Sequence, residues 1–224
     1  MFFLFLSRSR RIVSRRLGAP DPALLHVRQG SLRQRPVALV NPGIGAPCAV
    51  LALEHAVHDG HRQFWFLGAC GGLHPELRIG DIVLVEQAIS EEGTSPLYTK
   101  RGPKHSPNPA FTEALAETAG RMRVKVRRGG VWSTDAPHRE TSTKIRRYRS
   151  VGFLGVDMEV SALLAVARVR NVRIGGLLVV SDTLGDKGTV GWHWKAFRRG
   201  EDSAREVLIE TALKQQALLR RSSD

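Results

Sequence analysis

The residues best able to do chemistry in this sequence are carboxylates placed where predicted strands end. Met158-Glu159 stands between a short predicted strand and an apolar helical stretch, 161–169. Asp182 follows the predicted strand 174–180, and open α/β sheets build their ligand crevices at such strand ends. A carboxylate there can orient polar groups of a ligand or act as an acid. The same residues could instead be an ordinary first-turn glutamate and a turn cap.

Two glycine-containing segments offer backbone N–H groups to an anion. Predicted strand 37–40 leads into Asn41–Gly45, and predicted strand 63–67 leads into Gly68–Gly72. Backbone N–H groups in glycine turns can hold a phosphate or a carboxylate. Neither segment matches a dinucleotide-binding fingerprint, which is longer. We therefore predict only weak anion binding, by the following residues: Gly43, Gly45, Gly68 and Ala69.

Other chemistry is less well supported by the sequence. Trp132 follows the turn Gly129-Gly130, where its ring could stack on a flat ligand or pack in the core. There is no Walker loop, no serine nucleophile elbow and no clustered His/Cys set, so we expect no metal and no cofactor. Cys48 and Cys70 cannot form a disulfide framework, which predicts a reducing, cytoplasmic location.

The elements that must position these residues alternate between strands and helices. Apolar runs predict buried strands, and helical spacing predicts helices at 46–58, 111–119, 161–169 and 204–219. Strict alternation over 121–127 predicts a half-exposed strand with a basic outer face, and 90–109 is typical of a long surface loop. Together these patterns predict a single α/β domain with a central mixed β-sheet flanked by helices.

The positive charge is concentrated near the N-terminus. The chain has 224 residues and a formal net charge of +13, of which +7 falls in residues 1–36. We interpret 1–36 as a basic, poorly ordered extension and 37–224 as the α/β domain. Such an extension could bind nucleic acid or an anionic membrane, or resemble a transit peptide. No recognition motif accompanies it, and no apolar run is long enough to span a bilayer, so we expect no specific nucleic acid and no membrane as partner.

Taken together, seven segments resemble the nucleoside phosphorylase superfamily, which contains uridine phosphorylases, hexameric-type purine nucleoside phosphorylases and related nucleosidases. Over residues 37–215 they follow the order and approximate spacing of that family: Asn41–Gly45, Gly68–Leu73, Gly80–Val83, Glu92–Ser95, Trp132–Asp135, Gly155–Glu159 and Val180–Asp182. Glu92 through Tyr98 looks most like the uridine phosphorylase branch, whereas Ser181-Asp182 looks like the purine-cleaving branch. The resemblance implies the fold of this family and leaves the base open.

The resemblance also implies roles for individual residues. The family's residue at the position of Glu159 binds the ribose hydroxyls, and its residue at Met158 packs under the sugar. The residue at Asp182 helps to protonate the leaving base, and an aromatic ring at Trp132 would stack on it. Cleavage of an N-glycosidic bond builds positive charge on the ribose, which a carboxylate on the hydroxyls favours.

Further contacts and partners follow from the same resemblance. Ser181 and Thr94 lie within the matching motifs, so we expect both to contact the nucleoside. Relatives often complete the site with a neighbour's residues, which implies a homo-oligomer. The reaction of this family needs no cofactor, and inorganic phosphate would be a co-substrate.

The sequence departs from the family where phosphate is bound. Phe66 and Ala69 stand where phosphorylases have an arginine and a threonine or serine, and Ala19–Pro22 is at best a remnant of an N-terminal phosphate loop. Phenylalanine makes none of the bidentate bonds that arginine makes to phosphate. Replacement cations could come from the segment that contains Lys195, Arg198 and Arg199.

Three functions remain open on the sequence. The first is a nucleoside-cleaving enzyme, either a divergent phosphorylase with a rebuilt phosphate site or a nucleosidase that uses water. The second is a nucleoside-binding module without turnover, and the third is a basic interaction protein that binds polyanions through residues 1–36. The presence of both Glu159 and Asp182 favours an enzyme, because a binding module needs no acid at the base. The expected activity is therefore that of a pentosyltransferase or a nucleosidase.

Overall fold

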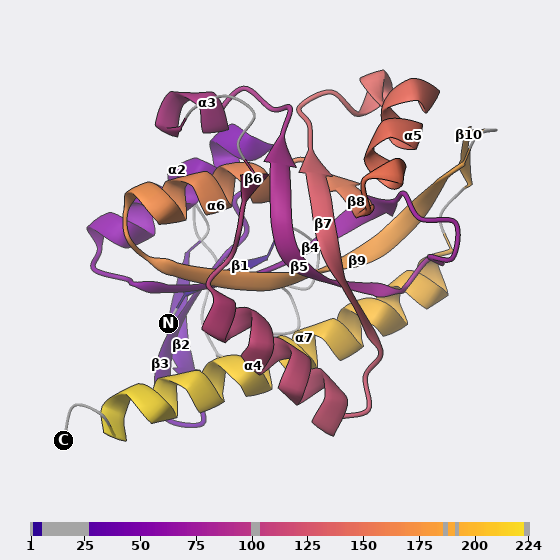
Figure 1. Cartoon of the computed structure of the whole chain (residues 1–224). Helices are drawn as coiled ribbons and strands as arrows, with labels where there is room; N and C mark the ends of the chain where they lie inside the picture. Colours follow the sequence, from indigo (N-terminus) through magenta and orange to yellow (C-terminus); the bar gives the residue numbers. More distant parts are fainter. Residues whose placement is uncertain (1, 6–26, 100–103, 186–187, 191–192, 222–224) are drawn as a thin grey trace.

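The apolar runs of the sequence form strands that join into one mixed sheet (Figure 1). The computed structural model describes residues 2–5, 27–99, 104–185, 188–190 and 193–221. The strands are β1 (Phe2–Phe5), β2 (Arg28–Leu32), β3 (Arg35–Val40), β4 (Gln63–Gly72), β5 (Ile82–Ser90), β6 (Lys104–His105), β7 (Val126–Ser133), β8 (Phe153–Asp157), β9 (Arg173–Gly185) and β10 (Gly188–Val190). The helices are α2 (Ala46–His58), α3 (Ser95–Tyr98), α4 (Pro109–Arg121), α5 (Ser142–Ser150), α6 (Val160–Val169) and α7 (Trp194–Arg221), with a 3-10 turn at Pro137–Arg139.

Part of the sheet closes on itself. β4 pairs in parallel with β9, β9 is antiparallel to β5, and β5, β7 and β8 are mutually parallel along the sheet. β8 then returns to the end of β4 as an antiparallel neighbour, which closes a ring of these five strands. β1, β3 and β2 extend the sheet on the other side of β4. The predicted α/β domain with a central mixed sheet is confirmed.

Helices cover the two faces of the sheet, as Figure 1 shows, with α2, α3 and α6 on one side and α4 and α7 on the other. Along β4, Phe64 and Phe66 face the α2/α6 layer, whereas Trp65 and Leu67 face the α4/α7 layer. All four side chains are buried, which explains why this strand is an unbroken apolar run rather than an alternating one. Within the described residues no helix is long and apolar enough to cross a membrane.

The structure corrects three expectations about the elements. Residues 1–36 are not wholly outside the fold: β1 lies between β3 and β4, and β2 pairs with β3, while residues 1 and 6–26 lie outside the described residues. The strand predicted at 63–67 continues through the glycines to Gly72, because β9 pairs with it throughout. The strand predicted at 121–127 is instead the end of α4, a turn and the first residues of β7.

Candidate active site

Glu159 stands at the N-terminal end of α6, buried to 7% exposure. Its Oε1 accepts a hydrogen bond of 2.6 Å from the backbone N–H of Gly45. Gly45 has φ of +97°, a conformation that residues with a Cβ rarely adopt, and it caps the start of α2. The turn before α2 therefore directs the N–H of Gly45 at the carboxylate of Glu159. The two residues are 114 positions apart in the chain.

Asp157, the last residue of β8, fixes the turn that carries Glu159. Its Oδ2 accepts hydrogen bonds from the backbone N–H groups of Glu159 (2.8 Å) and Val160 (2.6 Å). Its Oδ1 accepts a bond of 2.6 Å from the hydroxyl of Ser133, the last residue of β7. The start of α6 is thus tied to the carboxyl ends of two neighbouring strands, and the position of Glu159 is set by the sheet.

The surroundings of Glu159 favour its neutral form. Burial, followed by the negative charge of Asp157, raises the pKa of Glu159 from an ordinary value of 4.5 to about 7. The N–H of Gly45 opposes this rise because it stabilises the carboxylate. Donors from a bound ligand would act in the same direction as Gly45, so hydroxyl groups placed here would hold Glu159 in its charged form.

Asp182 lies in β9 opposite Gly71 of β4 and is half-buried. Its Oδ1 accepts a hydrogen bond of 2.6 Å from the hydroxyl of Ser181, and that hydroxyl also lies 3.1 Å from the carbonyl oxygen of Cys70. A Cβ on Gly71 would lie 3.5 Å from Oδ2 of Asp182. Ser181 is thus bound within the protein and positions Asp182, and its expected contact with the nucleoside stays a prediction.

A second carboxyl group, Glu140, lies near Asp182 and was missed by the sequence reasoning. It follows the 3-10 turn Pro137–Arg139 and is half-buried. Burial, and after it the charge of Asp182, raises the pKa of Glu140 to about 7. No motif marks Glu140 in the sequence, because the two residues meet only when the segment after β7 folds over the end of β9.

We expect Glu140 to make stability depend on pH. Its pKa is higher in the folded chain than the ordinary 4.5, so the folded state holds this proton more tightly. The stabilisation is therefore complete below about pH 4.5 and is lost as pH rises towards 7. Glu140→Gln should remove about 1–3 kcal/mol of this variation. Melting temperatures between pH 4.5 and 8 check it, and an unchanged pH profile in the variant would contradict it.

Thr94 and its neighbours surround a buried carboxylate rather than an open surface. Glu92 is 3% exposed and accepts hydrogen bonds from the backbone N–H groups of Thr94 (2.6 Å) and Ser95 (2.9 Å). It also accepts from the hydroxyls of Ser90 (2.7 Å) and Ser161 (2.9 Å). These bonds hold the pKa of Glu92 below its ordinary value against the effect of burial. Thr94 is thus fixed at the start of α3, next to α6.

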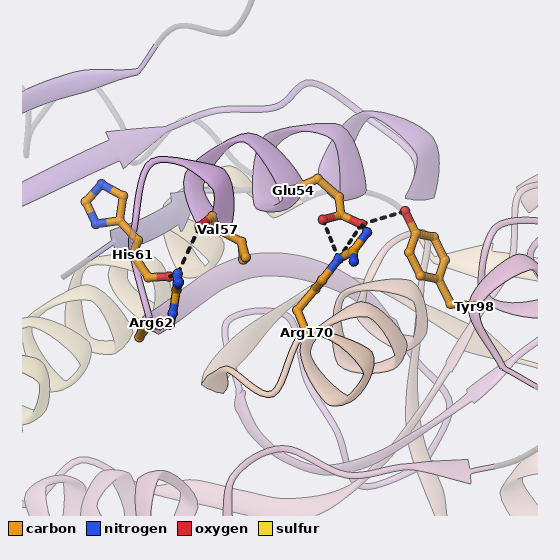
Figure 2. Close-up of polar contacts among 6 residues, drawn as sticks. All are labelled: Glu54, Val57, His61, Arg62, Tyr98 and Arg170. Carbon is orange, nitrogen blue, oxygen red and sulfur yellow. Dashed lines mark hydrogen bonds and ion pairs between the residues drawn. The ribbon is translucent and has the colours of Figure 1, made fainter.

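A second group of polar contacts, shown in Figure 2, connects helices α2, α3 and α6. Glu54 of α2 forms an ion pair of 2.8 Å with Arg170, directly after α6, and accepts a hydrogen bond of 3.0 Å from the hydroxyl of Tyr98 in α3. This contact lies towards the ends of α2 and α6 that are remote from Gly45 and Glu159. It fixes how the helices lie relative to one another and so supports the bond between those two residues.

Trp132 does not lie open to a ligand. Its side chain is 0% exposed and stacks on Tyr148 at a centroid distance of 4.5 Å. It belongs to an apolar cluster with Leu73 and Phe153 between the sheet and α5. A buried ring has no free face for a base, so the expected stacking by Trp132 does not fit this structure. Met158, in contrast, is half-buried beside Glu159.

The residues predicted to bind an anion have partners inside the protein. The N–H of Gly43 donates to Oδ1 of Asn41 at 3.0 Å, and the N–H of Gly45 donates to Glu159. Gly68 and Ala69 lie within β4, paired with Leu178 and Val179 of β9. The second glycine segment is therefore a strand and not an anion-binding turn. Across the described residues, no group of three or more His, Cys, Asp or Glu side chains could hold a metal ion.

The proposed replacement cations lie on the first turns of α7. Lys195, Arg198 and Arg199 are exposed, and the guanidinium of Arg198 lies over the ring of Trp194 at 4.9 Å. Arg199 lines a cavity with residues that precede β5 and β7. None of these three side chains forms a hydrogen bond or an ion pair with the described residues around Glu159.

Comparison with known proteins identifies the family to which this arrangement belongs. The family model described as "Phosphorylase superfamily" matches residues 10–215, most of the chain. The chain belongs to the phosphorylase superfamily. A uridine phosphorylase of Treponema pallidum is 31% identical over 67% of the chain, and a guanosine phosphorylase of Halorubrum lacusprofundi is 28% identical over 66% of it. These matches cover 63% and 61% of the relatives' own lengths, which is less than two thirds.

Solved structures agree with the phosphorylase superfamily fold. The purine nucleoside phosphorylase of Toxoplasma gondii, solved with immucillin-H, has a TM-score of 0.86 at 20% identity and covers 96% of this chain and 92% of its own. The uridine phosphorylase of Vibrio fischeri has a TM-score of 0.81 at 23% identity and covers 95% of this chain and 91% of its own. The expected nucleoside phosphorylase-like fold is confirmed.

Proposed function

We propose that this member of the phosphorylase superfamily cleaves the N-glycosidic bond of a nucleoside and transfers the pentosyl group to inorganic phosphate. The observation that carries the proposal is the buried carboxylate of Glu159, held at the start of α6 by the N–H of Gly45 and the turn through Asp157. Relatives named for uridine and guanosine phosphorolysis support a ribonucleoside substrate.

Glu159 would bind the ribose hydroxyls. Glu159 is buried and its pKa is raised to about 7. Two hydroxyl groups that donate to it would stabilise the carboxylate form, so substrate binding and ionisation of Glu159 support each other. As the glycosidic bond lengthens, positive charge develops on the ribose. A fixed carboxylate a few ångströms away then stabilises the transition state more than the bound substrate, which is the condition for catalysis.

Asp182 would donate a proton to the leaving base, and Glu140 would support it. A leaving base departs more readily when one of its ring atoms is protonated, and a carboxyl group serves as the acid if it keeps a proton near neutral pH. Glu140 can hold such a proton, because burial and then the charge of Asp182 raise the pKa of Glu140 to about 7. We propose that Asp182 contacts the base and passes on to it a proton that Glu140 supplies, which leaves Glu140 as a carboxylate.

Phosphate would have to bind without an arginine at position 66, where this sequence has Phe66. Phe66 is fully buried, and its ring lies 2.5 Å from where a Cβ on Gly176 would stand. Position 66 therefore belongs to the packing of β4 against β9. We propose that phosphate is held instead by residues of a second copy in a cytoplasmic homo-oligomer, whose mass light scattering would measure.

Base release from uridine, inosine, guanosine and adenosine, followed by chromatography with and without phosphate, tests the function. Release that requires phosphate and yields ribose 1-phosphate supports a phosphorylase. Equal release without phosphate would show a nucleosidase instead, and binding without release would show a non-catalytic module. The products thus distinguish a phosphorylase from a nucleosidase, and calorimetric titration with the same nucleosides detects binding without release.

A further inference from the structure

A basic cavity lies at the N-terminal ends of β5 and β7, whereas the turn that carries Glu159 adjoins the carboxyl ends of β7 and β8. It has a volume of about 420 Å³ and is formed by the turn before β5, the segment between α4 and β7, and the first turns of α7. Neither Glu159 nor Asp182 lines it. The lining residues used below are Ile79, Asp81, Arg123, Val124, Lys125 and Arg199.

The walls of this cavity are held by close backbone packing. A Cβ on Gly200 would lie 2.1 Å from the carbonyl oxygen of Gly80, so α7 contacts the turn before β5 backbone to backbone. The N–H of Gly80 donates to the carbonyl oxygen of Val180 at 2.8 Å, and the N–H of Val180 donates to that of Asp81 at 2.9 Å. The cavity thus rests on the closed part of the sheet.

Three cations on the lining are without partners among the described residues. The side chains of Arg123, Lys125 and Arg199 form no hydrogen bond or ion pair with any part of the chain that the structure describes. The next two basic residues along the chain do form ion pairs: Arg127 pairs with Glu76, and Arg128 pairs with Glu86 and Glu113.

The remaining groups on the lining leave the positive charge in excess. Asp81 is the single carboxylate among the lining residues, and its Oδ2 already accepts the backbone N–H of Arg78 at 3.0 Å. Arg123 has φ of 56°, a left-handed conformation that glycine adopts more easily. The backbone conformation therefore does not explain why this residue is an arginine. Ile79 and Val124 add apolar surface beside the cations.

We propose that this cavity binds a small phosphorylated ligand with at least two negative charges, a diphosphate-bearing molecule, at a site separate from Glu159 and Asp182. Its volume falls within the range of sites that hold small molecules. Arginine and lysine bind phosphate oxygens through charge-assisted hydrogen bonds, and the apolar residues would contact the organic part of the ligand.

Calorimetric titration of the full chain with inorganic pyrophosphate tests the site. We expect binding that weakens at higher salt, is unchanged in Glu159→Gln, and is weaker by about tenfold or more in the double variant Lys125→Gln/Arg199→Gln. The control Arg146→Gln/Arg168→Gln removes the same charge from exposed positions of α5 and α6 and should bind as the parent does.

The outcomes decide the proposal without reference to enzymatic activity. Equal affinity in the two double variants, or no binding to the parent chain, would overturn it. Both pairs of substitutions are at exposed positions, so we expect equal melting temperatures, and circular dichroism checks that the double variants are folded. A loss in the control alone would place the binding on another surface and would equally reject the cavity.

Discussion

Glu159→Gln should lower the rate of base release by about 10²–10³-fold, because the amide cannot supply the negative charge that the developing oxocarbenium ion requires. The substitution keeps the volume of the side chain and an oxygen that can accept the N–H of Gly45. It also removes a carboxyl group whose pKa burial raises to about 7, so the melting temperature at neutral pH should be unchanged or higher. Steady-state kinetics and thermal unfolding on the same preparation measure both effects.

The pH profile gives an independent readout of the same residue. Since substrate hydroxyls would donate to the carboxylate, kcat/KM should fall as pH drops below about 7, the value to which the pKa of Glu159 is raised. The control is Glu117→Gln on α4, which lies outside the candidate site and is exposed. Its rate should stay within about twofold of the parent. Full activity of Glu159→Gln would remove this residue from the mechanism.

Glu92→Ala should destabilise the chain by about 3 kcal/mol or more, since it leaves two backbone N–H groups buried without an acceptor. The hydroxyls of Ser90 and Ser161 can rotate to other acceptors, but the N–H groups of Thr94 and Ser95 cannot. The segment that enters α3 should therefore open first. Urea unfolding at pH 7 measures the loss in the free energy of unfolding.

The charge of Glu92 also makes the free energy of unfolding depend on pH. Its pKa is lowered in the folded chain, so its stabilisation is present above the ordinary 4.5 and is lost as pH falls through the folded value. Glu92→Ala should accordingly lose less stability on acidification than the parent does. Glu76→Ala is the matched control, because this exposed residue forms one surface ion pair with Arg127 and should cost at most about 1 kcal/mol. A similar small loss for Glu92→Ala would show that its buried bonds contribute little.

Local patterns predicted most of the elements. The helix expected at 46–58 is α2, and the helix expected at 161–169 lies within α6, because apolar residues at helical spacing must face the sheet. The half-exposed strand expected at 121–127 failed. Its alternation arises where α4 ends and Arg123 turns the chain, and seven alternating residues fit a helix end, a turn and a strand start as well as one strand.

The site was predictable where one short segment contains it. Met158-Glu159 follows β8 directly, so its position at a strand end could be read from neighbouring residues. Glu140 could not, since its partner Asp182 is 42 residues away in the chain and no pattern links them. Trp132 shows the opposite error: its motif suggested a ligand contact, but packing against Tyr148 buries it.

The sequence by itself determined the fold class, the family and the carboxylate at the start of α6, because each depends on local periodicity or on a run of residues in fixed order. Only the tertiary structure decided which groups meet. The closure of β8 onto β4, the place of β1 between β3 and β4, and the cavity between α7 and the ends of β5 and β7 all depend on pairings between distant segments. Such pairings follow from the packing of the whole sheet, where many residues decide each contact together.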